Sequence, residues 1–466
     1  MSPTPTRVAV VGGGIGGLTA AYLLGADPGR DVVLLEASPR LGGKLLRAEV
    51  GGVTVDVGAE AMLHRRPEGA ELAAELGLEV VHPTGAASRL WTGGALRPLP
   101  RSLMGVPLDL AALEASGVLS ERGLARVRAE PDLPPTVLHR DVSVGELVAR
   151  RLGDEVVDRL VEPLLGGVYA GHARLLSARA TVPQLVALLE RGSLLEAAAA
   201  LPVVHGPVFG GLAGGMGRLP EALAATGRFR VRTGATVRAL DRVDASTGGG
   251  FSLVLGPTRD EECLEVDEVV LAVPAAPAAR LLKGVAPAAA DALATVEHAS
   301  MAVVTLAFRA ADVPAHLADS SGFLVPPVEG RRIKASTFSF AKWDWVRAAG
   351  VGALDGEDLL LLRTSLGRHR EEQALQVPDQ ELVAASLADL ADAAGLTAPP
   401  VDSHVQRWGG GLPQYAVGHL DLVTKVRDAV AEVPGLAVCG AAYDGVGIPA
   451  VIASARRAAA SLRPAE

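Results

Sequence analysis

The fold is decided near the start of the chain by residues 7–17, RVAVVGGGIGG. The apolar half of this run is typical of a buried parallel strand, and residues 18–25 after it have a helical composition. A second apolar run, 32–35, ends at Glu36. Strand, glycine turn, helix, strand and acid in this order predict a βαβ unit that binds a dinucleotide.

The glycines and the acid of this unit each have a physical role in binding a dinucleotide. Gly12 permits the tight turn, Gly14 lets the backbone approach a pyrophosphate, and Gly17 lets the helix pack closely on the sheet. The N-terminus of the helix offers free N–H groups to the phosphates. Glu36, nineteen residues after Gly17, is placed to accept hydrogen bonds from ribose hydroxyls. The motif alone does not separate NAD from FAD.

Composition excludes several classes of protein. The 466 residues are 49% hydrophobic and 21% charged, which is ordinary for a globular chain of two or three domains. The net charge of −9 without a basic cluster predicts no nucleic-acid partner. Cys263 and Cys439 stand far apart, so we expect no disulfide framework, no metal site and a reducing cytoplasm. We identify no signal peptide and no membrane span.

The rest of the chain alternates between strand-rich and helix-rich stretches. Residues 107–201 are predicted to be mostly helical, with Ser143 and Glu146 spaced as a capping box. Predicted strands follow at 229–231, 236–240, 251–255 and 269–273. Near the C-terminus a strand at 436–439, a glycine-rich turn at 440–447 and a helix at 448–462 repeat the order of the first unit.

Two further motifs narrow the cofactor. Residues 36–44, EASPRLGGK, place a second glycine pair and a basic residue directly after the acid. This continuation resembles the amine oxidase and protoporphyrinogen oxidase superfamily of FAD proteins, in which that pair follows the pyrophosphate. The C-terminal run 439–449, CGAAYDGVGIP, is similar to the superfamily turn that lies beside the flavin ring. Its helix dipole would stabilise negative charge on the reduced ring.

The narrowest resemblance lies in the middle of the chain, in residues 144–171, VGELVARRLGDEVVDRLVEPLLGGVYAG. This run, Lys342-Trp343, and Arg407-Trp408 followed by 412–415, LPQY, resemble the porphyrinogen-oxidising branch. Within that branch the Lys342-Trp343 pair is most similar to the Gram-positive coproporphyrinogen III oxidases. The resemblance extends from residue 8 to about residue 460.

The resemblance implies a set of site residues. The cofactor would be non-covalent FAD, bound by Gly12, Gly13, Gly14, Ile15, Gly16, Gly17, Glu36, Ala37, Arg40, Gly43, Lys44, Gly58, Ala59, Glu60, Ala61, Val237, Trp408, Gly440, Val446, Gly447 and Ile448. The substrate would contact Arg89, Gly167, Tyr169, Ala170, Leu324, Lys342 and Trp343. No catalytic side chain is predicted, because flavin N5 would accept the hydride.

The resulting hypothesis is an oxygen-dependent coproporphyrinogen III oxidase of heme biosynthesis that releases H2O2. Protoporphyrinogen IX oxidation on the same scaffold is the alternative. Another flavin amine oxidase or desaturase, or a protein of this fold that binds prenylated GTPases without FAD, fits the motifs less well. The sequence leaves open which porphyrinogen is preferred, which cations bind its propionates, the oligomeric state and peripheral membrane contact.

The resemblance also implies an α/β architecture, α+β overall, of the amine oxidase type. A Rossmann-like FAD-binding domain would be built from discontinuous segments, beside a sheet-based substrate domain and a helical insert. The predicted segments are 1–75, 206–285 and 405–466 for the FAD domain, 76–100 and 286–404 for the substrate domain, 101–190 for the insert and 191–205 for a connection.

Overall fold

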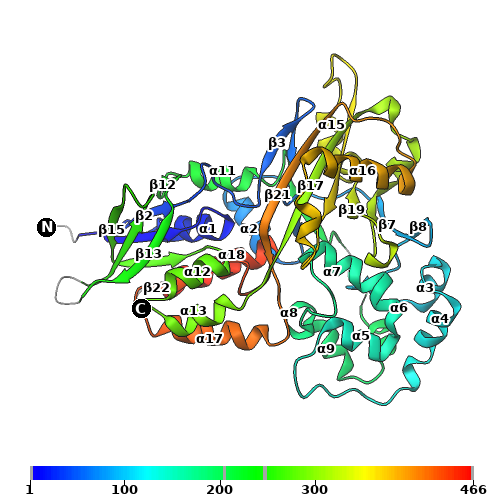
Figure 1. Ribbon diagram of the computed structural model, residues 1–466, viewed down its shortest axis with the longest axis horizontal. Helices are drawn as coiled ribbons and strands as arrows, with labels where there is room; N and C mark the ends of the chain where they lie inside the picture. The colour runs from blue at the N-terminus through cyan, green and yellow to red at the C-terminus, as the bar shows by residue number, and fades with distance from the viewer. Residues whose placement is uncertain (1–3, 203–205, 245–248, 463–466) are drawn as a thin grey trace.

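A five-stranded parallel sheet forms one side of the computed structural model, which describes residues 4–202, 206–244 and 249–462 (Figure 1). Part of the predicted connection 191–205 and both chain ends lie outside the described residues. The strands of this sheet come from distant stretches of sequence. The central strand β1 pairs with β2 on one side and with β16 on the other. The order is β12 (Arg230–Arg232), β2 (Arg30–Leu35), β1 (Thr6–Val11), β16 (Glu268–Leu271) and β22 (Leu436–Val438).

Both faces of this sheet are buried, which explains the continuous apolar strands. Val8 and Val10 point into a core shared with helices α1 (Ile15–Leu24) and α18 (Ile448–Ser461). Ala9 and Val11 point into the opposite core. That core also contains α12 (Ala275–Leu282), α13 (Pro287–Ala294), α17 (His419–Ala431) and the antiparallel strands β13 (Val237–Arg242), β14 (Phe251–Leu255) and β15 (Glu262–Val266).

A second sheet of seven strands lies on the other side of the molecule (Figure 1). β18 and β7 run parallel, and the other neighbours are antiparallel. Helix α16 (Asp379–Ala394) packs Leu382 and Leu390 against one face. The order is β21 (Asp402–Pro413), β17 (His298–Arg309), β20 (Leu359–Leu366), β19 (Ile333–Thr337), β18 (Ser320–Leu324), β7 (Ala87–Thr92) and β8 (Ala95–Pro98).

A helical region follows β8 and packs around its own apolar core. Its helices are α3 (Leu110–Ser116), α4 (Glu121–Arg128), α5 (Val144–Leu152), α6 (Asp154–Val156), a π-helical turn at Val157–Val161, α7 (Glu162–Tyr169), α8 (Ala178–Thr181), α9 (Pro183–Leu189) and α10 (Leu194–Ala199). Ser143 caps α5, since its Oγ accepts from the Glu146 N–H at 3.1 Å. The Glu146 carboxylate pairs with Arg150.

The predicted mixed α/β fold is confirmed, and each strand for which the sequence predicts bounds lies within two residues of an observed one. The predicted domain boundaries stay a prediction. Within the described ranges, none of the helices combines the length and the apolar character needed to cross a bilayer.

One buried ion pair fastens the helical region together. Glu130 is 0% exposed and Arg151 is 2% exposed, and Arg151 Nε donates to Glu130 Oε1 at 2.6 Å. The same carboxylate accepts from Ser193 Oγ at 2.6 Å and from the Leu194 N–H at 2.8 Å. Because Glu130, α5 and the start of α10 meet here, the pair holds three segments in one arrangement.

We expect Glu130→Ala to lower the free energy of unfolding by about 3–5 kcal/mol, because it leaves the Arg151 charge buried without its partner. The matched control is Glu146→Ala, which breaks the exposed pair with Arg150 and should cost less than about 1 kcal/mol. Urea unfolding of both variants measures the difference. Equal losses of unfolding free energy in the two variants would mean that the Glu130–Arg151 pair does not hold the helical region together.

Candidate functional site

The first glycine turn leaves free space in front of helix α1. Gly12 has a φ of +111°, and a Cβ there would lie 2.6 Å from the Ala272 carbonyl oxygen. A Cβ on Gly17 would lie 1.8 Å from the Gly12 carbonyl oxygen, so the chain itself requires both glycines. A Cβ on Gly14, the N-cap of α1, would meet no atom within 4 Å. The helix N-terminus is therefore open to a ligand at Gly14.

Glu36 holds this turn in place through two hydrogen bonds. Its Oε2 accepts from the Gly13 N–H at 2.6 Å, and its Oε1 accepts from the Ser38 N–H at 2.8 Å. The Ala235 N–H donates to the Glu36 carbonyl oxygen at 2.8 Å, which brings the start of β13, at Val237, close to the acid. Carboxylate oxygens have further lone pairs, so Glu36 retains acceptor capacity for ribose hydroxyls.

The second glycine pair lies directly on the first turn. The Gly42 N–H donates to the Gly13 carbonyl oxygen at 2.8 Å, and a Cβ on Gly43 would lie 3.1 Å from the Gly14 Cα. Arg40 Nη1 donates to the Gly43 carbonyl oxygen at 2.9 Å. The Arg40 guanidinium also lies 5.8 Å from the ring centroid of Trp408. The structure thus brings four predicted cofactor residues, Gly14, Arg40, Gly43 and Trp408, into one place.

Lys44 lies beside this group. A Cβ on Gly58 would lie 2.0 Å from the Lys44 carbonyl oxygen and 3.2 Å from the Trp408 ring, so the three residues pack together. The Lys44 side chain is exposed, yet the surrounding protein lowers the pKa of its ammonium by desolvation. The adjacent Ala59 N–H donates to the Lys44 carbonyl oxygen at 3.0 Å.

The C-terminal turn meets the N-terminal one. Gly440 has a φ of +129°, and a Cβ on it would meet no atom within 4 Å. A Cβ on Gly16 would lie 3.7 Å from the Gly440 Cα and 3.1 Å from Val451 in α18. Helix α18 begins at Ile448, directly after Gly447. Both helices therefore begin close together, with open space at Gly14 and Gly440 beside them, which suits a long anionic ligand such as a dinucleotide.

Gly167 in α7 and Leu324 in β18 are two predicted substrate residues that face one another, and we call this pair the wall. Gly167 is exposed, and a Cβ on it would lie 3.9 Å from Leu324 Cδ2. Tyr169 is buried with its ring centroid 5.6 Å from that of Tyr415, and burial raises the pKa of Tyr169 to about 12. Ala170 closes α7 with a φ of +48°. Gly167 and Leu324 are thus neighbours, as a shared substrate contact requires.

Arg89 does not join this wall. In the paired strands β7 and β18, Leu90 stands opposite Leu324 and Arg89 stands opposite Phe323. Leu90 belongs to the core of the helical region, whereas Phe323 belongs to the core beneath α16. Since side chains alternate along a strand, Arg89 points to the face opposite that of Leu324.

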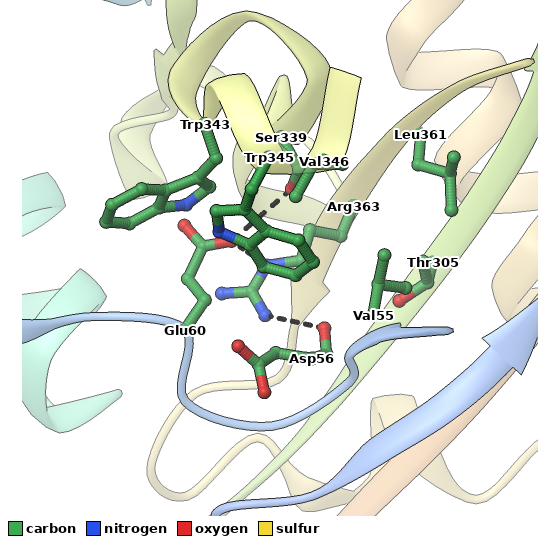
Figure 2. Close-up of a pocket in the computed structure, with 10 residues that line it drawn as sticks. All are labelled: Val55, Asp56, Glu60, Thr305, Ser339, Trp343, Trp345, Val346, Leu361 and Arg363. Atoms are coloured by element: carbon green, nitrogen blue, oxygen red, sulfur yellow. Dashed lines mark hydrogen bonds and ion pairs between the residues drawn. The ribbon is translucent and has the colours of Figure 1, made fainter. Parts of the chain in front are cut away.

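Lys342 and Trp343 lie beside Glu60, and Figure 2 shows Trp343, Glu60 and Arg363 around one small cavity. Lys342 Nζ forms an ion pair with Glu60 Oε1 at 2.6 Å, and Arg363 Nε lies 3.1 Å from Glu60 Oε2. Trp343 is 1% exposed, and the cavity beside its indole measures only about 10 Å³. Lys342 is therefore held in an ion pair with Glu60, which it shares with Arg363, and the Trp343 ring is enclosed. The roles of Lys342 as a substrate cation and of Trp343 as a macrocycle contact stay predictions without geometric support.

The ion pairs of Glu60 therefore hold in place the turn that contains Gly58, Ala59 and Ala61. Burial by itself raises the pKa of Glu60, but the Arg363 and Lys342 charges outweigh burial and lower the pKa to about 2. Arg363 Nη1 also donates to the Gly58 carbonyl oxygen at 2.7 Å. Sequence reasoning missed Arg363. The available signal was a lone arginine within the apolar strand β20.

Comparisons with known proteins agree with this geometry. Residues 15–463 match the family described as flavin containing amine oxidoreductase. The chain is 39% identical to a coproporphyrinogen III oxidase of Mycobacterium tuberculosis, over 98% of each chain. It is 30% identical to the enzyme of that name from Bacillus subtilis, over 96% of each. A crystal structure from Exiguobacterium sp. 255-15, provisionally named protoporphyrinogen oxidase, superposes with a TM-score of 0.84 at 32% identity, covering 99% of each chain.

We expect Gly14→Val to fold normally and to purify without flavin, because its side chain has space in the protein but would fill the place of a phosphate. The matched control, Gly17→Ala, should instead be destabilised by roughly 1–3 kcal/mol or more, since its Cβ would overlap the Gly12 carbonyl oxygen. Flavin absorbance per protein and the Tm after removal of flavin separate the two effects. A fully yellow Gly14→Val variant would contradict the assignment of this turn.

The Glu60 ion pairs also predict an acid dependence of stability. Because the pKa of Glu60 falls from an ordinary 4.5 to about 2 on folding, its contribution is complete above pH 4.5 and is lost between pH 4.5 and about pH 2. Glu60→Gln should therefore show a smaller loss of unfolding free energy in this window than the unchanged protein. The control is Glu357→Gln, at an exposed pair with Arg309. Parallel pH curves for Glu60→Gln and the unchanged protein would refute the expectation.

Proposed function

We propose that this chain, which belongs to the flavin-containing amine oxidoreductase family, oxidises coproporphyrinogen III to coproporphyrin III with O2 as the acceptor. The observation that carries the proposal is the full-length similarity, at 39% identity, to an enzyme named for this reaction. The exposed backbone of Gly167 opposite Leu324 adds support, since a flat macrocycle approaches glycine more closely than any other residue.

FAD is the flavin that the two glycine turns fit. Gly14, the N-cap of α1, and Gly440, just after β22, both leave open space, and Glu36 retains acceptor capacity beside the Gly14 turn. A mononucleotide would need only one of these turns. We propose that the pyrophosphate lies on the Gly14 turn, that the ribose contacts Glu36, and that the ring lies towards Gly440 and Val446, with the adenine near Val237.

We propose that this binding is non-covalent. Cys439 is fully buried, its Sγ lies behind Gly16, and burial raises the pKa of its thiol to about 12. A thiol of that pKa is protonated at neutral pH and is a poor nucleophile for a flavin thioether. Cys263 is exposed on β15, in the antiparallel strands away from the glycine turns. Both thiols are unpaired, which also fits the proposed cytoplasmic location.

When bound, a flavin supplies hydride acceptance from a carbon and transfer of the electrons to O2. The protein has to orient the substrate and exclude competing reactions. Tyr169 stays protonated because burial raises its pKa to about 12, and His419 stays neutral because burial lowers its pKa to about 4. Neither group is suited to act as a base at neutral pH. The pyrrole protons would therefore leave to water, and the wall at Gly167 and Leu324 would hold the macrocycle.

Protoporphyrinogen oxidation is the second candidate, because the similar structure from Exiguobacterium is provisionally named for it. Amine oxidation has support only from the shared fold. A binding protein without flavin would have no use for two open glycine turns, so colour is a simple first test: the purified protein should be yellow.

We expect kcat/KM for coproporphyrinogen III to exceed that for protoporphyrinogen IX by about tenfold or more under air, because additional charged groups can be recognised. Porphyrin fluorescence measures the rate, and a peroxide assay should find three H2O2 for each porphyrin, one for each pair of electrons removed. A clear preference for protoporphyrinogen IX would select the second candidate. Absence of porphyrin from either substrate would refute the proposed function.

A further inference from the structure

Two cations are buried directly behind the wall of Gly167 and Leu324. Lys334, in β19, is 3% exposed, and its Nζ donates to the carbonyl oxygens of Leu366 at 3.3 Å and Gly367 at 2.9 Å. Arg368, just beyond β20, is 6% exposed. Arg368 Nη2 donates to the Val325 carbonyl oxygen at 3.0 Å, whereas Arg368 Nη1 is buried without a partner.

The two charges have no counter-ion in ion-pair contact. Among the residues that the structure describes, no carboxylate oxygen comes within 4.0 Å of a nitrogen of either side chain. Burial lowers the pKa of Arg368, and the charges of Glu371 and Glu162 oppose this only in part. Glu162 is buried, its Oε1 accepts from the Ala173 N–H at 3.0 Å, and burial raises its own pKa. Glu371 is half exposed and faces His172 at 3.8 Å. A buried cation without a partner is costly, so this arrangement requires an explanation.

The position of the cations relates them to the substrate wall. A Cβ on Gly166, next to Gly167, would lie 2.9 Å from Arg368 Nη1. The Val325 N–H, next to Leu324, donates to the Lys334 carbonyl oxygen at 2.9 Å. The pairing of β19 with β20 shifts register between Ile333 and Ala335, so alternation does not assign a face to Lys334. Its ammonium lies close to Arg368, because burial and, second, the Arg368 charge lower the pKa of Lys334 to about 7. Arg368 therefore lies directly behind α7, with Lys334 next to it.

We propose that Lys334 and Arg368 form a carboxylate subsite that receives a propionate of the porphyrinogen, an inference that rests on the proposed function. A carboxylate would provide the missing negative charge and would accept from the free Arg368 Nη1. The cations suggested by the sequence are less suitable. Lys342 is held in an ion pair by Glu60, and Arg89 points to the opposite face of the sheet.

The test is a fluorescence titration of the flavin-loaded protein with coproporphyrin III and, separately, with its tetramethyl ester. Neither probe turns over, and the ester has the same ring without the charges. Arg368→Gln should weaken binding of the tetracarboxylate about tenfold and leave binding of the ester unchanged, because only a charged group gains from the guanidinium. Lys334→Met should act in the same direction. Arg309→Gln, at an exposed pair with Glu357, is the matched control and should change neither.

A merely structural role would give a different pattern. If the variants weaken acid and ester equally, or leave binding of the acid unchanged, the subsite is refuted. Arg368→Lys should recover most of the preference for the acid, which a packing defect would not allow, and the Tm and flavin absorbance of the variants should stay close to those of the unchanged protein. If the unchanged protein oxidises neither porphyrinogen, the proposed function fails, while the titration still decides whether these cations bind carboxylates.

Discussion

The close contact between α1 and α18 is the constraint on which the rest of the site depends. Gly16 makes it possible, because a side chain there would press on Val451 and approach Gly440. The contact brings two helix N-termini from opposite ends of the chain to the same edge of the parallel sheet. Gly43 and Arg40 lie against the Gly14 turn, and Trp408 lies next to Arg40, so these predicted cofactor residues gather around the start of α1.

The Glu60 ion pairs connect this region to the second sheet. Glu60 follows the turn at Gly58, while Lys342 and Arg363 belong to the sheet-based region. Burying three charges costs free energy, and their mutual attraction returns it only because the geometry is close. Above pH 4.5 the pairs therefore stabilise the fold and also fix the position of the Gly58 turn. They hold the Gly58 turn, which packs on Lys44 and Trp408, at a fixed distance from β20.

What could be predicted from the sequence was local. The Gly12–Gly17 turn, Glu36 and the C-terminal turn each combine motif and element within a few residues, so the order of residues predicts the geometry. The partners of Lys342, Trp343 and Arg89 lie far away in the chain. Whether Lys342 is free depends on Glu60, 282 residues before it, and no pattern near Lys342 reveals that. Lys334 was missed for the same reason, since a lysine in an apolar strand has no visible partner until the strands pair.

Tyr415 explains why the helical region stands where it does. Its ring lies 5.6 Å from that of Tyr169 and stacks on His419 at 3.9 Å. Its hydroxyl donates to the Ala441 carbonyl oxygen, and its own carbonyl oxygen accepts from the Ser177 N–H at 2.7 Å. One buried side chain thus connects the C-terminal glycine turn, α17 and the helices behind the wall. Because Tyr415 contacts both Tyr169 at the end of α7 and Ala441 next to Gly440, its packing fixes the wall at Gly167 relative to the turn at Gly440, the two places for which we propose the macrocycle and the flavin ring.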